Sequence, residues 1–189
     1  MFTHKKTAQV AAFLASGLGS KSIKYMRLLK LMYLSDRESL ARFAEPLSYD
    51  QMYSMDYGLV LSEVLNAVQS LRFNGDLRPW GSYFRARRNK TDYYVSLNRR
   101  VSRDELDFLS DSDIEILNAV LAKFGEMDEW ALSQYMHDHC AEWKDPDGSR
   151  IPVDDRELLQ ILGLPEEEAE VTAKSLRSER QMGRIFSRR

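Results

Sequence analysis

The segment from Ser22 to Phe43 constrains the fold of this chain more than any other feature of the sequence. From Ile23 to Leu34 its apolar residues cover nearly every side of a helix, interrupted only by three basic residues. A helix that is hydrophobic on most of its faces is usually the buried centre of its domain. Pro46 ends the pattern. We therefore expect a domain built around this helix, with its leucines and methionines buried.

The first half of the chain also carries helix, strand and turn signals around that central helix. Glycines end an amphipathic first segment, and aromatic and β-branched residues alternate with polar ones in two later regions. The expected elements are a helix over 5–18, an extended segment over 47–57, a helix over 59–71, a loop at Asn74, Gly75 and Pro79, and a β-hairpin of strands 83–88 and 91–97 around Asn89-Lys90.

Helical signals dominate the second half. The pairs Ser102/Glu105 and Ser112/Glu115 fit the capping box, in which serine and glutamate satisfy free amides of the first helical turn. The expected helices cover 112–124, 129–139, 154–162 and 165–182. The last has an acidic start and a basic end, which complement the helix dipole. We predict a mainly α-helical α+β fold: a single globular domain over 1–189, with six to seven helices, a small β-hairpin, and a C-terminal helix and basic tail over 165–189.

Composition excludes several classes of protein. The net charge of −2 gives no bulk attraction to nucleic acid or to an anionic membrane. The single cysteine, Cys140, excludes an intrachain disulfide and fits a reducing compartment. No apolar stretch approaches the ~20 residues needed to span a bilayer. The run 7–20 after Lys5-Lys6 resembles a signal peptide, but it is too polar and alanine-rich, so we expect an ordinary helix and a cytoplasmic protein.

The catalytic inventory is thin. The only cluster with ligand chemistry is His137-Asp138-His139-Cys140, and residues two apart on a helix point about 200° away from each other. Helical zinc pairs are spaced four apart instead. Cys140 as a nucleophile would need a base and an orienting group, and only His137 is near in sequence. The common nucleotide-binding and hydrolase motifs do not occur. We expect no enzymatic activity, no cofactor and no metal site.

The predicted hairpin and its exit are rich in arginine and tyrosine. The cations are Arg85, Arg87, Arg88, Lys90, Arg99, Arg100 and Arg103, and the interleaved aromatic residues are Tyr83, Phe84, Tyr93 and Tyr94. Three interpretations remain open. The segment could bind single-stranded nucleic acid by phosphate contacts and base stacking. It could dock an acidic protein, because tyrosine and arginine are favoured in interface hot spots. It could be a solvated hairpin whose aromatic rings pack on the core.

Helices 112–124 and 129–139 resemble a helix-turn-helix in their spacing. The second would be the reading helix, yet it has no lysine or arginine and is flanked by acidic residues. Such a helix repels phosphate. A transcriptional regulator that uses the basic hairpin is thus our alternative hypothesis, with nucleic acid disfavoured as a partner.

Four motifs, in order, resemble those of a known family. Residues 24–37, KYMRLLKLMYLSDR, are similar to the K-L-x-K-L-L-Y-L-x-D helix of the Panacea antitoxin domain, also called the SocA-like domain. Gly58-Leu59-Val60 stands where that family usually has Gly-Pro-Val. Residues 109–117 resemble its L-S-x-x-E-x-x-x-L helix start. The stretch from Leu132-Ser133 to Trp143 resembles its L-S-x-x-T-H…W segment, with methionine at 136 in place of threonine.

The resemblance implies a bacterial or phage antitoxin that neutralises a separately encoded toxin by direct binding. One branch of the family delivers its toxin to an AAA+ protease as an adaptor. The family fold is helical with a small β element. We interpret the motif positions as structural: Leu28, Lys30, Leu31, Tyr33, Asp36, Gly58, His137 and Trp143. The pattern leaves a homo-oligomer open.

We predict that Tyr83, Arg85 and Arg87 contact the toxin, because alternate residues of a strand share one face. The competing contact site is the basic stretch from Lys174 to Arg189, which could order on binding a partner.

Overall fold

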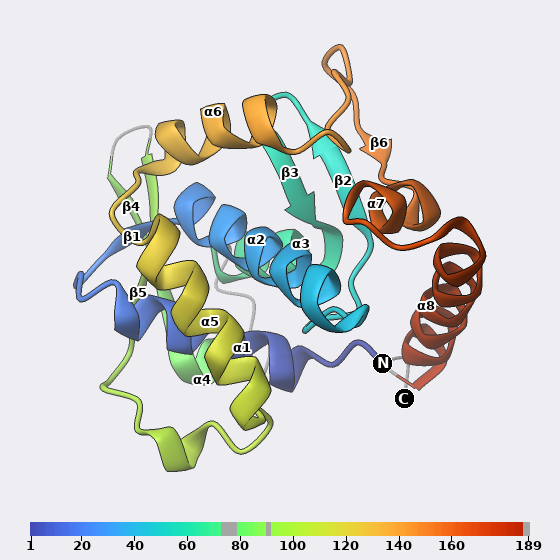
Figure 1. Ribbon diagram of the computed structural model, residues 1–189. Helices are drawn as coiled ribbons and strands as arrows, with labels where there is room; N and C mark the ends of the chain where they lie inside the picture. Colours follow the sequence, from blue (N-terminus) through green and yellow to red (C-terminus); the bar gives the residue numbers. More distant parts are fainter. Residues whose placement is uncertain (73–78, 90–91, 187–189) are drawn as a thin grey trace.

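The computed structural model describes residues 1–72, 79–89 and 92–186. Within these residues the chain forms eight α-helices, one short 3-10 helix and six strands in two three-stranded antiparallel sheets (Figure 1). The elements are α1 (His4–Gly17), β1 (Ile23–Lys24), α2 (Tyr25–Phe43), β2 (Met52–Met55), β3 (Gly58–Leu61), α3 (Ser62–Arg72), α4 (Trp80–Tyr83), β4 (Phe84–Asn89), β5 (Asp92–Leu97), η1 (Arg103–Glu105), α5 (Asp111–Phe124), α6 (Glu129–His139), β6 (Ile151–Pro152), α7 (Asp155–Ile161) and α8 (Glu166–Phe186). The predicted turn residues Asn74, Gly75 and Lys90 lie outside the described residues, and so does Thr91, the first residue of the predicted strand 91–97.

Helix α2 lies at the centre of the molecule, between α5, α1, α6 and β3 (Figure 1). The side chains of Leu28 and Leu31 are fully buried, and that of Met32 is 1% exposed. The nearly continuous apolar surface of this helix therefore has neighbours on all sides. The mainly helical α+β fold and its central helix are confirmed, and the eight described α-helices exceed the predicted six to seven because the short α4 was not predicted.

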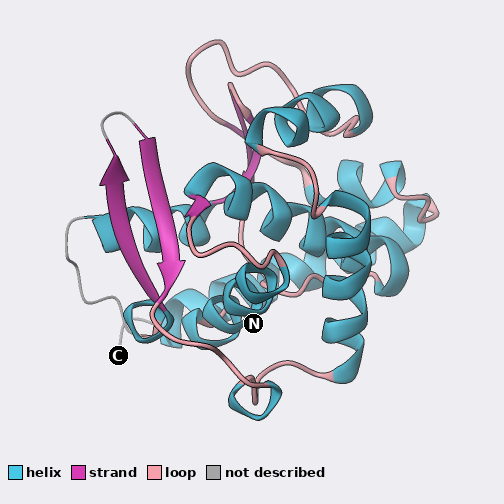
Figure 2. Cartoon of the chain, turned by 90° about the vertical axis from the view of Figure 1, so that its left-hand side faces the viewer, coloured by secondary structure: helices cyan, strands magenta, loops and turns pink. Residues whose placement is uncertain are grey.

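The first sheet has the strand order β1-β5-β4 and stands at one side of the molecule (Figure 2). The predicted hairpin forms its larger part. The third strand, β1, is short, and pairs Ile23 with Val95 and Lys24 with Tyr94. The central helix therefore begins at Tyr25 and not at Ser22, because residues 23–24 extend to complete this sheet.

The second sheet has the order β3-β2-β6. The predicted helix over 59–71 begins at Ser62, since residues 58–61 are a strand that pairs with β2. The carboxylate of Asp50 accepts hydrogen bonds from the backbone N–H groups of Glu63 (2.8 Å) and Val64 (3.0 Å). This carboxylate satisfies free amides of the first turn of α3, as an N-cap does. It comes from more than ten residues upstream, outside the local pattern.

Of the two predicted capping boxes, one is confirmed and one is shifted. Ser102 and Glu105 form the box that opens η1. The box of α5 is made by Ser110 and Asp113, two residues before the predicted pair, and Asp111 is the first helical residue. An aspartate takes the role that the sequence motif reserves for glutamate or glutamine, which is why the pattern missed it.

The two C-terminal helices, α7 and α8, pack against each other at the edge of the molecule (Figure 1). Arg180 of α8 donates a hydrogen bond to the carboxylate of Asp155 in α7, and both residues are buried. The N-terminal amino group also reaches α8, 3.1 Å from a carboxylate oxygen of Glu179. The last predicted helix continues to Phe186, and residues 187–189 lie outside the described part. Among the described helices, none is long and apolar enough to cross a membrane.

Candidate partner-binding site

A cationic groove lies between the loop that joins α1 to β1 and the β4–β5 hairpin, with a volume of about 870 Å³. Its charged lining residues are Lys21, Arg85, Arg87, Arg99 and Arg100. Serine residues contribute hydroxyl groups, and no carboxylate lines the groove among the described residues. A second hollow that shares Ser22 and Arg87 extends it toward Tyr94. The volume falls within the ~300–1,000 Å³ of typical binding sites.

The charges in the cationic groove are largely uncompensated. In the described part of the chain, Lys21, Arg87 and Arg100 form no ion pair, whereas Arg99 pairs with Glu105. The guanidinium of Arg85 donates hydrogen bonds to the side-chain oxygen (3.1 Å) and backbone oxygen (3.2 Å) of Asn98. A neutral amide positions this cation without cancelling its charge. A cleft lined by one sign of charge attracts ions of the other sign, so the groove should attract an acidic partner.

Tyr83 does not share the exposed face of Arg85 and Arg87, which corrects the predicted arrangement. It lies in α4, because strand β4 begins one residue later, at Phe84. Its side chain is only 8% exposed, and its hydroxyl donates to the carbonyl of Glu105 at 3.4 Å. Arg85 and Arg87 are exposed neighbours on β4, as predicted, and both line the groove.

The other aromatic residues of the hairpin are mostly turned into the core. Phe84 is 2% exposed and Tyr93 is 9% exposed, with the Tyr93 ring edge-to-face on Tyr25 at 5.4 Å. Tyr94 is half-buried. Binding of single-stranded nucleic acid depends on exposed rings on which bases stack. The packing of these aromatic rings on the core is confirmed, and it weakens the nucleic-acid interpretation more than the protein one.

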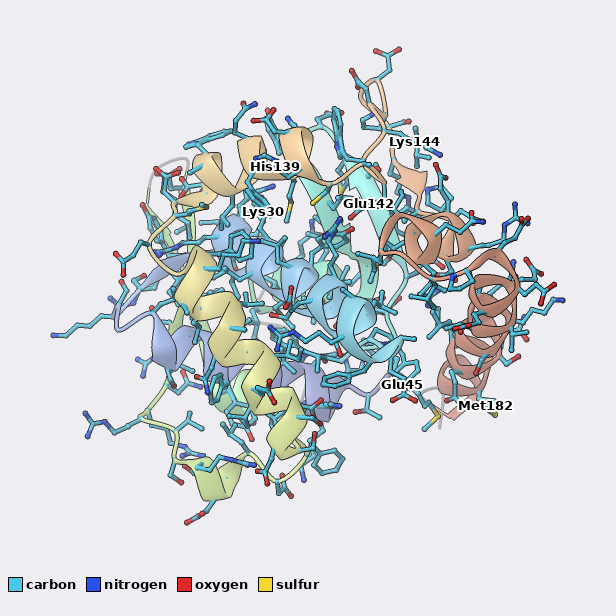
Figure 3. The ribbon with its side chains drawn as sticks, in the orientation of Figure 1. Lys30, Glu45, His139, Glu142, Lys144 and Met182 are labelled. Atoms are coloured by element: carbon cyan, nitrogen blue, oxygen red, sulfur yellow. The ribbon has the colours of Figure 1, made fainter. Side chains whose placement is uncertain are left out.

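Lys30, Ser133 and Gly58 meet at the turn between β2 and β3, although they are far apart in sequence. The ammonium group of Lys30 donates a hydrogen bond to the carbonyl of Tyr57, and the hydroxyl of Ser133 donates to the same oxygen at 2.7 Å. The side chain of Lys30, a residue of α2, lies between this helix and α6 (Figure 3). Burial lowers the pKa of its ammonium group to about 8. The turn is thus held to α2 and α6 together.

A protein-family model described as "Antitoxin SocA-like, Panacea domain" matches residues 28–144, more than half of the chain. The chain belongs to the SocA-like Panacea antitoxin family. The matched region extends from α2 to the residues after α6, and so includes Arg85 and Arg87. No curated protein and no solved structure matches the chain.

In this Panacea chain the motif residues join α2 to the segment after α6. The hydroxyl of Tyr33 donates to Oε1 of the buried Glu142 at 2.6 Å, and Nε of Arg37 donates to the same oxygen at 2.7 Å. The indole N–H of Trp143 donates to the carbonyl of Met55 at 3.0 Å, and its ring centroid lies 4.1 Å from that of His137. These contacts support a structural role for the motif positions. Glu142, the common acceptor, carries no signal in the sequence.

Asp36 ties the same Panacea helix to the loop that follows it. Its carboxylate accepts hydrogen bonds from the backbone N–H of Ser48 (3.0 Å) and from the Ser48 hydroxyl. Burial raises the pKa of Asp36 to about 7, although the bonds from Ser48 act in the opposite direction. The side chain therefore carries a proton over part of the physiological pH range.

The residues with ligand chemistry are separated in the structure. The rings of His137 and His139 pack on different partners, Trp143 and Tyr135. Among the described residues, no group of three His, Cys, Asp or Glu side chains could hold a metal ion. Burial raises the pKa of the Cys140 thiol to about 12, and the nearby Glu142 acts in the same direction. A reactive cysteine needs the opposite shift, toward thiolate at neutral pH.

Proposed function

We propose that the protein is an antitoxin that neutralises a cognate protein toxin by direct binding, with an acidic surface of the toxin seated in the cationic groove at Arg85 and Arg87. The observation that carries the proposal is the groove itself, lined by five cations and no described carboxylate, within a chain of an antitoxin family. Neutralisation by binding needs no catalytic group.

The charge distribution supports a protein partner over nucleic acid. The chain as a whole has a net charge of −2, so the positive potential is local to the groove. The rings that would stack on bases are mostly buried. In the spacing of a helix-turn-helix, α6 would be the reading helix, and it carries no lysine or arginine. Complementary charge mainly accelerates association and selects the partner. Association with the toxin should therefore slow as salt screens the groove.

The test is rescue of bacterial growth from the cognate toxin, which we expect to be encoded by a toxic reading frame beside this gene. The double variant Arg85→Glu/Arg87→Glu should abolish rescue, because it places two carboxylates where an acidic surface docks. Circular dichroism should remain that of the wild type, since both side chains are exposed on an existing strand.

The matched control reverses the same number of charges on the competing site. Lys174 and Arg177 are both exposed on α8, and Lys174→Glu/Arg177→Glu should leave rescue intact. Deletion of residues 183–189 should also have the smaller effect. Loss of rescue in these two variants, with full rescue by the groove variant, would place the toxin on α8 and refute the proposed site.

Neutralisation could proceed by blocking the toxin or by delivering it to an AAA+ protease. The abundance of the toxin in growing cells separates the two routes. A toxin that stays abundant and inactive supports blocking, whereas a toxin whose half-life shortens when the antitoxin is present supports delivery.

A further inference from the structure

Tyr57 and Trp130 form an exposed aromatic pair away from the cationic groove. Their rings are edge-to-face with centroids 5.7 Å apart, and the residues are 58% and 55% exposed. Tyr57 belongs to the turn between β2 and β3, and Trp130 to the first turn of α6. Tryptophan and tyrosine dominate interface hot spots. Two such residues left in contact with solvent therefore suggest a docking surface.

A small pocket lies beside this aromatic pair, with Tyr57 in its wall and a volume of about 180 Å³. Its apolar lining residues include Met26, Leu29, Met55, Val60 and Leu65. Sites for drug-sized ligands measure ~300–1,000 Å³. This pocket is smaller, so its size suits one side chain of a larger partner. The two methionines are pliable and can adapt to the shape of that side chain.

Lys30 gives this small pocket, which we call the anchor pocket, a preference for negative charge. It lines the pocket, and its ammonium group is hydrogen-bonded to the carbonyl of Tyr57. A lysine ammonium has three donors, and in the described part of the chain no carboxylate forms an ion pair with this one. Asp56, the acidic lining residue, is exposed and accepts a hydrogen bond from the N–H of Gly148 at 3.1 Å. A carboxylate on the partner would therefore meet an uncompensated positive charge.

The anchor pocket and the cationic groove are both lined by residues next to β1. Lys21 lines the groove just before this strand, and Tyr25 lines the pocket just after it. Lys24, between them, pairs with Glu129 at the start of α6 (2.5 Å). Figure 1 shows α6 beginning beside β1 and β4. One partner can therefore cover both sites, with apolar contacts at one and charged contacts at the other.

We infer that the toxin inserts one large apolar side chain, flanked by a carboxylate, into the pocket beside Tyr57 and Trp130 while its acidic surface occupies the cationic groove. The inference rests on the proposed function and names the second half of the same interface. Anchoring by one buried side chain accounts for affinity, and the groove accounts for charge selection.

The first test measures the Kd of the complex with the toxin co-purified from the native operon. The variant Tyr57→Ala/Trp130→Ala should bind at least about tenfold more weakly, as expected for hot-spot residues. Phe43→Ala is the matched control, because Phe43 is an aromatic residue of similar exposure (50%) at the far end of α2. An aromatic double variant that binds within about twofold of the wild type overturns the inference.

Two further measurements keep the test independent of the folding of that variant. Leu65→Phe fills the pocket from α3 and leaves the aromatic pair in place, so it should weaken binding as well. In the wild-type protein, the indole N–H signal of Trp130, one of three tryptophans, should shift in the ¹⁵N-resolved NMR spectrum when the toxin binds. An unshifted signal overturns the inference.

The outcomes distinguish the anchor from the proposed function. One outcome refutes the anchor alone: the wild-type protein and the anchor variants bind the toxin normally, whereas the Arg85→Glu/Arg87→Glu variant does not bind it. If the wild-type protein does not bind the toxin, the proposed function fails and the anchor fails with it.

Discussion

Lys30 of α2 and Ser133 of α6 donate hydrogen bonds to one acceptor, the carbonyl oxygen of Tyr57. Three segments separated by more than 25 residues are thereby tied at the turn between β2 and β3. The same turn presents the Tyr57 ring to solvent beside Trp130. A backbone carbonyl held from two sides keeps that ring in place, so residues that serve the fold also shape the proposed interface.

Gly58 should be intolerant of substitution because of this turn. Its φ of +105° is unfavourable for residues with a side chain, and a Cβ atom would lie 2.9 Å from Nζ of Lys30 and 3.1 Å from Sδ of Met136. Gly58→Ala should lower the free energy of unfolding by more than the ~1–3 kcal/mol that backbone strain alone would cost. Gly163→Ala is the control, since Gly163 has a φ of +100° and no atom within 4 Å of its Cβ position. Equal losses in urea unfolding would show that the close contacts carry no cost.

Leu31→Ala should lower the free energy of unfolding by ~2–5 kcal/mol and reduce the soluble yield, because Leu31 is fully buried in the central helix. Ile161→Ala, at a 37% exposed position near the end of α7, should have a much smaller effect. Thermal melts of the two variants provide the measurement. A melt of Leu31→Ala that matches the wild type would contradict the central position of α2.

Stability should fall as pH rises from about 4 to about 7, in part because of Asp36. Burial raises the pKa of this carboxyl from 3.8 to about 7 in the folded protein. In that window the folded state binds a proton that the unfolded state has released, so the free energy of unfolding decreases with pH and levels off above 7. Asp36→Asn should reduce the difference in urea stability between pH 5 and pH 8. An unchanged difference would mean that Asp36 does not titrate in this pH range. Asp50, whose pKa burial raises to about 6, adds to the pH dependence of stability in the wild-type protein.

Duplex DNA should bind weakly, with a dissociation constant in the non-specific range of ~10⁻⁴–10⁻⁶ M and a strong dependence on salt. The groove offers cations without exposed rings, and the candidate reading helix α6 carries no lysine or arginine. Gel shifts at increasing salt provide the measurement. Nanomolar, sequence-selective binding at physiological salt would favour the transcriptional regulator over the antitoxin.

Helical elements were predictable because their signals are local. The apolar surface of α2, the acidic start of α8 and the Ser102/Glu105 cap each lie within a few consecutive residues, and the structure contains all three. The short strands were not predictable, because the pairing of β1 with β5, for example, brings together residues about 70 apart in the sequence. Nothing in Ile23-Lys24 alone distinguishes an edge strand from the first turn of a helix.

Some features of the candidate site were likewise predictable from the sequence, and others were not. The sequence alone determined the dense cluster of cations around Arg85 and Arg87, their alternate placement on a strand, and the family motifs. Only the tertiary structure decided that Tyr83 is buried, that Lys21 joins the groove, and that Tyr57 and Trp130 meet beside a pocket. Charge content and periodicity are properties of neighbouring residues, whereas burial and the meeting of distant side chains depend on how the helices and sheets pack around α2.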